Sequence, residues 1–437
     1  MMIPDTWCKL LACGVLVYWF GYWLFHLAAI CYGKYKLHRI KKQQTDVNTV
    51  SVEADKDYPG VSIIKPMVGV DPNLADNLRT YFTIDYPKYE VLLCVQDSND
   101  PAIQVATTML ETYGSSVDLR LLIGASDVGV NPKICNMHPA YSQAKYPFVL
   151  ISDSSIKMRR DTLKDMVDCM QNDVAIVHQI PFTCDRIEDI HKSGIRQRRF
   201  VATLEKVFFG TAHARIYLVA DLIRAVCHTG MSSLIRKRAL DECGGLGAFA
   251  QYLAEDYFIA QQLVERGWRT TISGLPALQN SGTLDLYRFH DRLRRWVKLR
   301  ASMVPYTIVL EPMSECLILG AIAAWSTHLL VPTVDPYAFY LVHTLIWFLL
   351  DWILLRTIQG SPLPFTRVEY SIAWLYRECL GPYIFLTALL WRPRIIRWAA
   401  RTYKLRLGGI AETVDTDLEC TNILTNVVIE QPPKIKV

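Results

Sequence analysis

Residues 148–155 read F-V-L-I-S-D-S-S, in which five strand-forming residues, Phe148–Ser152, are followed at once by Asp153. The stretch 89–97, Y-E-V-L-L-C-V-Q-D, has the same form and ends on Asp97. Short apolar runs bounded by polar residues are typical of buried strands. An acidic residue directly after each run indicates two strands that present carboxylates at their carboxyl ends.

The same alternation of short apolar runs and amphipathic stretches continues on both sides of these segments. Because strands that alternate with helices form mainly parallel sheets covered on both faces, the pattern predicts an α/β domain over residues 61–303. Such sheets bind ligands beyond the carboxyl ends of their strands. The expected strands are Val61–Met67, Tyr89–Gln96, Leu119–Ile123, Phe148–Ser152 and Val174–Ile180, and the expected helices are Asn73–Thr83, Pro101–Tyr113, Asn136–Lys145 and Thr162–Asn172.

The composition favours a membrane enzyme over a soluble one. Of the 437 residues, 51% are hydrophobic and 20% are charged, which is too apolar for an ordinary soluble enzyme and too charged for a bare bundle of membrane spans. The net charge of +5 is modest, and the basic residues cluster beside apolar segments. This placement indicates flanks of membrane spans and excludes a nucleic-acid-binding role. The 12 scattered cysteines indicate a reducing compartment rather than a disulfide framework.

Residues 10–32 contain no Lys, Arg, Asp or Glu and predict a transmembrane helix, which needs roughly 20 apolar residues. Lys9 precedes this segment, and a basic cluster follows it. The positive-inside rule therefore predicts that residues 1–9 are lumenal, that residues 33–60 form a basic flank and linker, and that the α/β domain lies in the cytosol. The basic cluster consists of Lys34, Lys36, Arg39, Lys41 and Lys42.

Apolar character returns in residues 304–391, which we expect to form membrane-associated and transmembrane helices. Cys316–Val334 and Tyr337–Leu355 are candidate spans, although Asp351 interrupts the second. Tyr370–Trp391 is a third candidate, and it remains open whether it spans the membrane or is re-entrant or interfacial. The residues that interrupt it are Arg377, Glu378, Gly381 and Pro382.

Residues 392–437 are expected to form a basic flank and a flexible tail. The side of the carboxyl terminus stays open, because three full spans would place it in the lumen whereas the arginines favour the cytosol. These arginines are Arg392, Arg394, Arg397 and Arg401.

The two strand-end carboxylates, Asp97 and Asp153, are expected to converge on one crevice, where a nucleotide and a divalent cation would bind. The alternative for each is an exposed loop or helix-cap aspartate. Asp256 lies near the start of an amphipathic helix in A-E-D-Y-F, where an acidic residue also suits the helix dipole.

A strongly basic helix, Arg288 to Arg300, contains Arg292, Arg295 and Trp296 in the order R-L-R-R-W. Its cations could meet lipid phosphate at the membrane surface. Alternatively, an arginine and the tryptophan could close over a pyrophosphate and a sugar or lipid group. Different faces of one helix can serve both roles.

The ordered set Asp97, Asp153, Asp256 and Arg292-x-x-Arg295-Trp296 resembles the D, D, D, (Q/R)-x-x-R-W pattern of membrane family-2-like glycosyltransferases. Longer strings resemble the ceramide glucosyltransferases, also called glucosylceramide synthases, and the resemblance covers nearly the whole chain. These strings are K-P-M-V-G-V-D-P-N-L, D-Y-P-K-Y-E-V-L-L-C-V-Q-D, G-V-N-P-K-I, A-E-D-Y-F and G-W-R.

The resemblance implies a GT-A nucleotide-sugar fold that transfers glucose from UDP-glucose to ceramide with inversion, on the cytosolic face of the Golgi membrane. It implies that Asp97 lies against the uridine, that Asp153 holds Mg²⁺ or Mn²⁺, and that Asp256 is the base. Arg295 and Trp296 would act at the diphosphate and acceptor side, together with Arg292 in the same motif.

Three further residues are candidates for the site. Lys65 and Lys133 could supplement a phosphate clamp, although each stands alone beside a proline and a solvated surface lysine is the more common outcome. The resemblance implies that His213, in F-G-T-A-H-A-R, lies near the active site, although a lone histidine is more often structural. The segment Phe208–Val226 could be an interfacial helix that admits the lipid.

The metal position departs from the Asp-x-Asp of many relatives, because residues 152–155 read S-D-S-S and offer only Asp153. Magnesium commonly uses one or two carboxylates plus substrate phosphates, so a metal is still expected, with weak affinity in the absence of nucleotide. The choice of metal, the ceramide chain length and the oligomeric state are left open.

Two other functions fit the pattern less well. A processive polysaccharide synthase needs a channel of spans, and the predicted spans are few for one. A non-enzymatic membrane scaffold with a degenerate transferase fold would lose at least one motif position, and none is lost.

Overall fold

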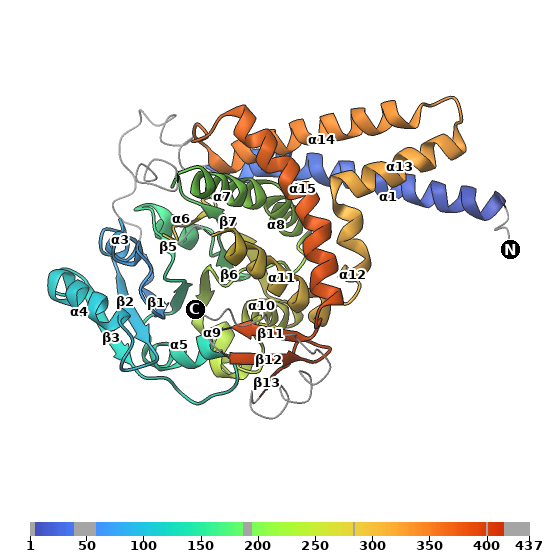
Figure 1. Ribbon diagram of the computed structural model, residues 1–437. Coiled ribbons are helices and arrows are strands. Elements are labelled where there is room, and N and C mark those ends of the chain that lie inside the picture. The colour runs from blue at the N-terminus through green and yellow to red at the C-terminus, as the bar shows by residue number, and fades with distance from the viewer. Residues whose placement is uncertain (1–4, 39–57, 187–194, 283–284, 399–400, 415–437) are drawn as a thin grey trace, which may run out of the picture.

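A mainly parallel sheet forms the core of the α/β domain (Figure 1). Its strands are β1 (Val61–Met67), β2 (Tyr89–Val95), β3 (Asp118–Ile123), β4 (Phe148–Ser152), β6 (Val174–His178), β8 (Ser232–Arg236) and β9 (Arg269–Ile272). The order is β3-β2-β1-β4-β8-β6-β9, with β8 antiparallel to both neighbours and all other pairs parallel. This arrangement confirms the predicted α/β fold with a mainly parallel sheet. The computed structural model describes residues 5–38, 58–186, 195–282, 285–398 and 401–414.

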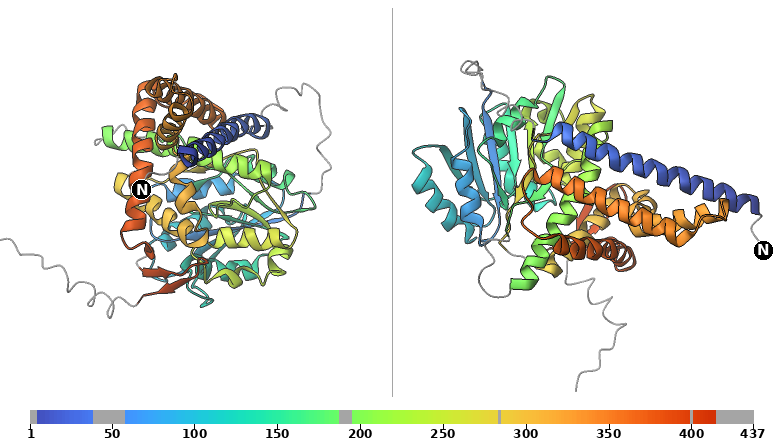
Figure 2. Two further views of the ribbon diagram at one scale, coloured as in Figure 1. Left: turned by 90° about the vertical axis from the view of Figure 1, so that its right-hand side faces the viewer. Right: turned by 90° about the horizontal axis from the view of Figure 1, so that it is seen from above.

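Both faces of this sheet are buried, which explains why its strands read as continuous apolar runs. Ile63 and Leu93 point to one face and Ile64 and Leu92 to the other, and none of the four is exposed to solvent. Helices cover both faces (Figure 2). These are α3 (Leu74–Arg79), α4 (Ala102–Tyr113), α5 (Pro132–Gln143), α6 (Thr162–Asp168), α9 (Lys237–Asp241) and α10 (Glu255–Glu265).

The expected strands are confirmed to within two residues at either end, but the start of α5 was predicted too late. The helix begins at Pro132 rather than Asn136, because Asn131 caps it and accepts hydrogen bonds from the backbone N–H groups of Lys133 and Ile134. Strands β8 and β9 were not predicted from the sequence. A small second sheet lies beside the main one and has the order β5 (Ile156–Lys157), β10 (Ala277–Gln279), β7 (Pro181–Thr183).

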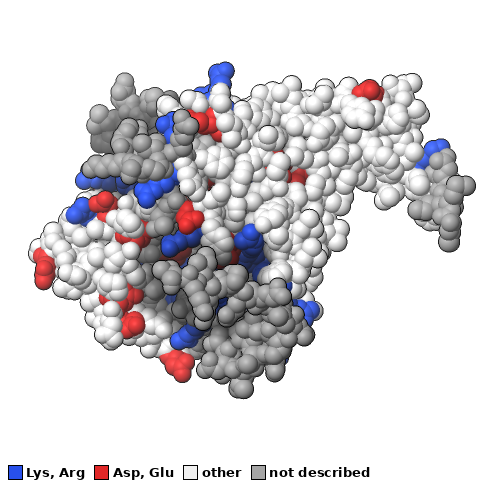
Figure 3. All heavy atoms as spheres, in the orientation of Figure 1, with Lys and Arg blue, Asp and Glu red and all other residues white. Residues whose placement is uncertain are grey.

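Long apolar helices project from the α/β domain as an arm (Figures 1 and 2). The arm consists of α1 (Asp5–Lys36), α13 (Cys316–Leu330) and α14 (Pro336–Gln359). By length and composition α1 and α14 are able to cross a membrane, and α13 is a shorter apolar helix. Few charged side chains lie on the surface of the arm in Figure 3. The apolar helices expected at both ends of the chain are therefore confirmed, whereas Arg39, Lys41 and Lys42 of the basic cluster lie outside the described residues.

A second group of helices joins the arm to the α/β domain. It consists of α7 (Ile195–Phe208), a π-helical turn (Phe209–His213), α8 (Ala214–Ile223), α11 (Leu286–Met303), α12 (Thr307–Leu310) and α15 (Arg367–Leu390). The break expected at Gly381-Pro382 does not end α15, which runs through Pro382 as one helix.

Residues 392–437 were expected to form a basic flank and then a flexible tail, but the structure forms strands as far as residue 413. A three-stranded antiparallel sheet forms there from β11 (Ile395–Trp398), β12 (Arg401–Leu405) and β13 (Ala411–Thr413). Ile410 forms a β-bridge with Tyr252, next to α10, and Tyr403 is fully buried. These strands are stabilised by packing on the α/β domain, which a local sequence pattern does not reveal. Residues 415–437 lie outside the described residues.

Candidate active site

Lys65 is buried at the carboxyl end of β1, where it supports the turn that carries Asp153. Its Nζ donates a hydrogen bond of 2.6 Å to the backbone carbonyl of Asp153 and lies 3.9 Å from the centre of the Tyr81 ring. Burial lowers the pKa of Lys65 to about 7, although the charge of Asp153 opposes this shift. The expected solvated surface lysine is therefore wrong here, because β1 lies inside the sheet next to β4.

Lys133 bridges the strand-end carboxylate and the start of α10. Its Nζ lies 2.9 Å from Oδ1 of Asp153 and 3.4 Å from Oε1 of Glu255, and it donates a hydrogen bond of 3.0 Å to the carbonyl of Gly230. Burial acts to lower the pKa of Lys133, but the two carboxylates outweigh it and raise that pKa overall. The surface-lysine expectation is wrong here too, because the cap at Asn131 points the first turn of α5 into the site.

Asp256 faces the loop before β8 and also accepts a hydrogen bond from the first turn of its own helix, α10, although the N-cap position is Ala254. Its Oδ2 accepts a hydrogen bond of 2.6 Å from the backbone N–H of Gly230, and Oδ1 accepts one of 2.8 Å from that of Tyr257. A Cβ at Gly230 would lie 3.2 Å from both Lys133 Nζ and Asp256 Cβ, so a larger residue would crowd both side chains. Burial raises the pKa of Asp256, opposed by the charge of Lys133. A raised pKa brings a carboxylate closer to the range that suits a general base.

Asp97 lies at the carboxyl edge of the sheet, as Asp153 does, because β2 and β4 flank β1 in parallel. It is exposed, and its Oδ1 accepts a hydrogen bond of 2.9 Å from the N–H of Asn99. The shared edge agrees with the expected crevice, but no direct contact joins Asp97 to the other site residues described. Its neighbour Asp100, which was not predicted from the sequence, accepts hydrogen bonds from the N–H of Gly69 and orders the loop after β1.

The basic helix α11 borders a cleft of about 340 Å³, and its two motif arginines differ in their partners. Arg292 donates hydrogen bonds to Glu205 (3.1 Å) and Gln279 (3.3 Å), so the protein itself already engages its guanidinium. Arg295 lines the same cleft and has no hydrogen bond or ion pair within the described residues. Burial lowers the pKa of Arg295, with Asp291 opposing. An enclosed arginine without a partner is suited to bind an anionic group.

This cleft adjoins the turn after Asp153. The N–H of Asn280 donates a hydrogen bond of 2.7 Å to the carbonyl of Ser155, and Asn280 follows Gln279 of the cleft lining. Asp71, from the loop after β1, accepts a hydrogen bond of 2.8 Å from the N–H of Gly282. The strand-end turn, the loop after β1 and the start of α11 therefore meet at one place.

Aromatic rings surround His213, in an arrangement that we term the aromatic wall. The His213 ring stacks on Trp296 with centroids 5.7 Å apart and an interplanar angle of 27°. Tyr217 lies 4.9 Å away, and Phe208 and Phe209 complete the wall at 5.6 and 5.2 Å. His213 closes a π-helical turn, a distortion that is frequent at functional sites.

His213 is held in its neutral form. Burial lowers its pKa to about 3, and the charges of Arg300 and Arg292 add to the shift. Its Nδ1 is buried and has no hydrogen-bond partner among the described residues. A neutral imidazole with an unused nitrogen can donate or accept one hydrogen bond to a bound hydroxyl or amide.

The aromatic wall adjoins the loop that holds Asp256. The hydroxyl of Tyr217 donates a hydrogen bond of 3.2 Å to the carbonyl of His228, two residues before Gly230. Tyr217, Gly230 and Glu205 were not identified individually from the sequence. For Lys133 the sequence does contain a signal, because the preceding Asn131-Pro132 pair is typical of a capped helix start and places Lys133 in the first turn of α5.

The residues at Asp153 fit a divalent cation only in part. No group of three or more His, Cys, Asp or Glu side chains that could hold a metal occurs in the described part of the chain. Lys133 engages Oδ1 of Asp153, whose side chain keeps an exposed fraction of 34%. One carboxylate oxygen is thus left for a cation, whose other ligands would have to come from nucleotide phosphates and water.

Comparison with known proteins gives consistent results. The profile of Glycosyl transferase family 21 matches residues 21–411. The chain is 41% identical to ceramide glucosyltransferase 3 of Caenorhabditis elegans over 403 residues, which cover 92% of this chain and 82% of that protein. It is 40% identical to ceramide glucosyltransferase 1 of the same organism over 393 residues, covering 90% and 79%. The ceramide glucosyltransferase of Komagataella phaffii is 28% identical over 438 residues, covering 81% and 84%.

Among solved structures, the chain is similar to a mannosyltransferase from Pyrobaculum calidifontis in complex with GDP-Man and Mn²⁺. The identity is 16% and the TM-score 0.43, with 88% of this chain and 99% of that chain covered. It is also similar to TarS of S. aureus in complex with UDP-GlcNAc, at 14% identity and a TM-score of 0.35, covering 82% and 99%.

Proposed function

The chain belongs to glycosyl transferase family 21 and is a relative of the ceramide glucosyltransferases, and from this premise we propose that it transfers glucose from UDP-glucose to the primary hydroxyl of ceramide. The products are β-glucosylceramide and UDP, so the reaction is the first step of glycosphingolipid synthesis. The observation that carries the proposal is the position of Asp256, a partly buried carboxylate between Lys133 and the loop that adjoins the aromatic wall.

Asp256 is the general base of the proposed reaction. A primary hydroxyl is a poor nucleophile at neutral pH, and a carboxylate that accepts its proton during attack contributes roughly 10²- to 10⁴-fold to the rate. Attack opposite the leaving group inverts the α-linked donor to a β product in one step. One base is then sufficient, and no covalent intermediate is needed.

The donor side uses the remaining motif residues. Asp97 lies against the uridine, and Asp153 binds Mg²⁺ or Mn²⁺, which would supply Lewis-acid stabilisation of the diphosphate when bound. Lys133 holds Asp153 in place, and Arg295 offers its planar guanidinium to two phosphate oxygens. Positive charge placed where negative charge develops on UDP lowers the barrier to its departure.

The acceptor reaches the site from the membrane. Exposed apolar side chains of α8, namely Ile216, Leu222 and Ile223, suit contact with lipid. The sphingoid chain and the amide of ceramide lie along the aromatic wall, with the unused nitrogen of His213 as a hydrogen-bond partner.

The enzyme is a multi-pass protein of the Golgi membrane with its α/β domain on the cytosolic face. Because Ile410 pairs with Tyr252 of that domain, the chain after α15 lies on the same side as the domain. The helices after residue 303 therefore cross the membrane an even number of times, which α13 and α14 satisfy as a hairpin.

The test is a matrix of nucleotide sugars and lipid acceptors offered to the purified full-length protein, with products resolved by mass and anomeric configuration. We expect β-glucosylceramide from UDP-glucose and ceramide alone. An insoluble polymer in place of a lipid product would instead identify a polysaccharide synthase. Absence of any transfer or donor hydrolysis would identify a non-enzymatic scaffold.

A further inference from the structure

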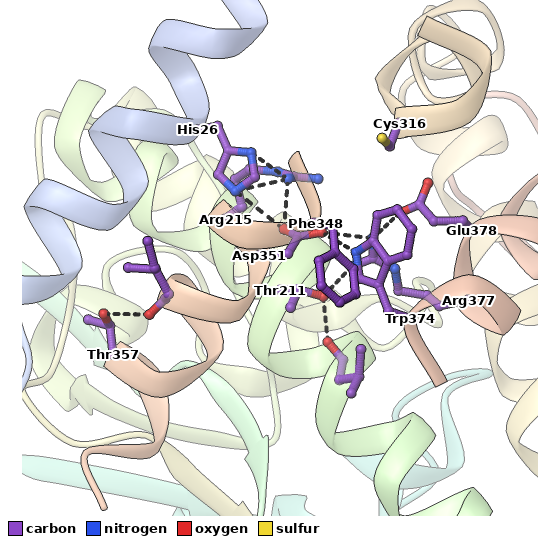
Figure 4. A network of polar contacts seen from close by, with 12 residues as sticks. His26, Thr211, Arg215, Cys316, Phe348, Asp351, Thr357, Trp374, Arg377 and Glu378 are labelled. Carbon is purple, nitrogen blue, oxygen red and sulfur yellow. Dashed lines mark hydrogen bonds and ion pairs between the residues drawn. The ribbon is translucent and has the colours of Figure 1, made fainter. Parts of the chain in front are cut away.

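Asp351, the charged residue that interrupts the apolar helix α14, lies at the centre of a buried polar network (Figure 4). Its Oδ1 lies 3.2 Å from Nη1 of Arg215 and 3.3 Å from Nε2 of His26. Its Oδ2 accepts hydrogen bonds of 2.9 Å from both Arg377 and Trp374. These five residues, which we term the Asp351 network, come from α1, α8, α14 and α15. All five are buried, with at most 4% of the side chain exposed for the four ionisable residues and 4% of the whole residue for Trp374.

A network of this kind needs a reason beyond stability. Removing two arginines and an aspartate from water is costly, and apolar residues of similar volume often give equal or greater stability. Ionisable groups at membrane depth are by default candidates for function. The question is therefore what the Asp351 network holds in place.

Its two arginines hold the π-helical turn on either side of His213. Arg377 donates a hydrogen bond through Nη1 to the hydroxyl of Thr211, two residues before His213. Arg215, two residues after His213, is bound by Asp351. Residues two apart on a helix do not face the same way. Thr211 and Arg215 accordingly point into the Asp351 network (Figure 4), while His213 stacks on Trp296.

We propose that Asp351 is a positioning residue for the acceptor site, because its carboxylate fixes Arg215 and Arg377 and thereby keeps His213 stacked on Trp296. The inference rests on the proposed function in one respect, which is that ceramide binds along the aromatic wall. It links a carboxylate in an apolar helix of the arm to the acceptor side of the reaction. Asp351 itself touches neither substrate nor any donor-side residue among those described.

The primary test is Asp351→Asn in the full-length protein, assayed in nanodiscs with ceramide and UDP-glucose varied separately. Loss of the charge removes the ion pair that Asp351 forms with each arginine. Arg377 then keeps only its ion pair with Glu378, so the turn can shift. We expect kcat/KM for ceramide to fall by up to about 10²-fold, the cost of a misplacement of roughly 1 Å. The KM for UDP-glucose and donor hydrolysis without acceptor should stay within about twofold of wild type, because no donor-side residue contacts the network.

A double-mutant cycle with His213→Ala separates positioning from general destabilisation. If Asp351 acts through His213, adding Asp351→Asn to His213→Ala changes kcat/KM for ceramide by less than about twofold. If the two losses multiply instead, Asp351 does not act through His213 and the inference is wrong.

Thr211→Val provides a second variant in case Asp351→Asn does not fold. It removes the acceptor of the Arg377 hydrogen bond but keeps every charge and nearly the same shape. We expect the same selective loss for ceramide, about tenfold, because one hydrogen bond to a charged group is lost. Wild-type kinetics for ceramide in Thr211→Val would overturn the inference.

His343→Gln is the matched control, since His343 is also a buried polar residue of α14. It accepts a hydrogen bond of 3.1 Å from Trp19 of α1 and contacts the carbonyl of Cys316 at 3.1 Å, but it has no hydrogen bond to the π-helical turn. We expect His343→Gln to lower the Tm but to leave the ratio of kcat/KM for ceramide to kcat/KM for UDP-glucose unchanged. The same selective ceramide defect in this control would overturn the inference, whereas a wild-type protein that glucosylates no ceramide would overturn the proposed function instead.

Discussion

The cluster of charges at the strand ends and the Asp351 network are both built from carboxylates and cations, yet they differ in what remains unsatisfied. At the strand ends the Asp153 side chain keeps 34% exposure and only one of its oxygens is paired, whereas the Asp351 carboxylate is fully buried with both oxygens engaged. The Asp153 carboxylate therefore has an oxygen free to bind a ligand, whereas the Asp351 carboxylate binds only the protein side chains around it. This difference assigns chemistry to the first region and positioning to the second.

The comparison predicts its largest effect at Asp153. We expect Asp153→Ala to abolish turnover and any stimulation by Mg²⁺ or Mn²⁺, because it is the sole carboxylate at the end of β4. Titration of the metal at saturating UDP-glucose measures both quantities. The control is Asp161→Ala, since Asp161 lies after β5, just before α6, and pairs with Arg159 at 2.8 Å near the surface. Metal stimulation that survives in Asp153→Ala would remove Asp153 from the donor site.

A smaller effect is expected at Arg295. This residue has no ion pair among the described residues, whereas the arginines of the Asp351 network are paired with carboxylates. Arg295→Lys keeps the charge but loses the planar fork, so we expect kcat/KM for UDP-glucose to fall about 10- to 100-fold. The adjacent Arg294→Lys is the control, because Arg294 faces Thr387 of α15 instead. Near-wild-type activity of Arg295→Lys would show that α11 serves only the membrane.

The smallest effect concerns pH and His213. The pKa of His213 in the folded protein is about 3, below the usual value of about 6.5. As the pH falls below about 6.5, His213 therefore binds a proton in the unfolded chain but not in the folded protein. The stability of the folded protein therefore declines as the pH falls from about 6.5 towards 3. His213→Phe keeps a ring on Trp296 but does not titrate, and its Tm should fall less than that of wild type between about pH 7 and about pH 5. Equal losses of Tm would show that His213 is solvated.

The sequence predicted the sheet well because apolar runs report burial directly. The strands from Val61 to Ser152 and the acidic residues that follow them could be placed without tertiary information. The three strands between Ile395 and Thr413 could not, because they are stabilised by contact with Leu253 of the α/β domain. The late start expected for α5 came from overlooking Asn131 as a cap.

The candidate site was predicted unevenly for the same reason. Asp153 and Asp256 stood out by their position after a strand and at a helix start. Lys65 and Lys133 looked like surface lysines, because their burial depends on partners that are distant in sequence, such as Glu255. Asp351 was recognised only as an interruption of an apolar helix, since its cations come from α8 and α15.

Single-turnover transfer by folded Asp256→Asn, measured beside UDP-glucose binding, tests the central claim most directly. The amide keeps the shape of the carboxylate but cannot accept the hydroxyl proton, so the account predicts intact donor binding and transfer slowed by at least about 10²-fold. Transfer at the wild-type rate would contradict it and would show that Asp256 only supports the start of α10.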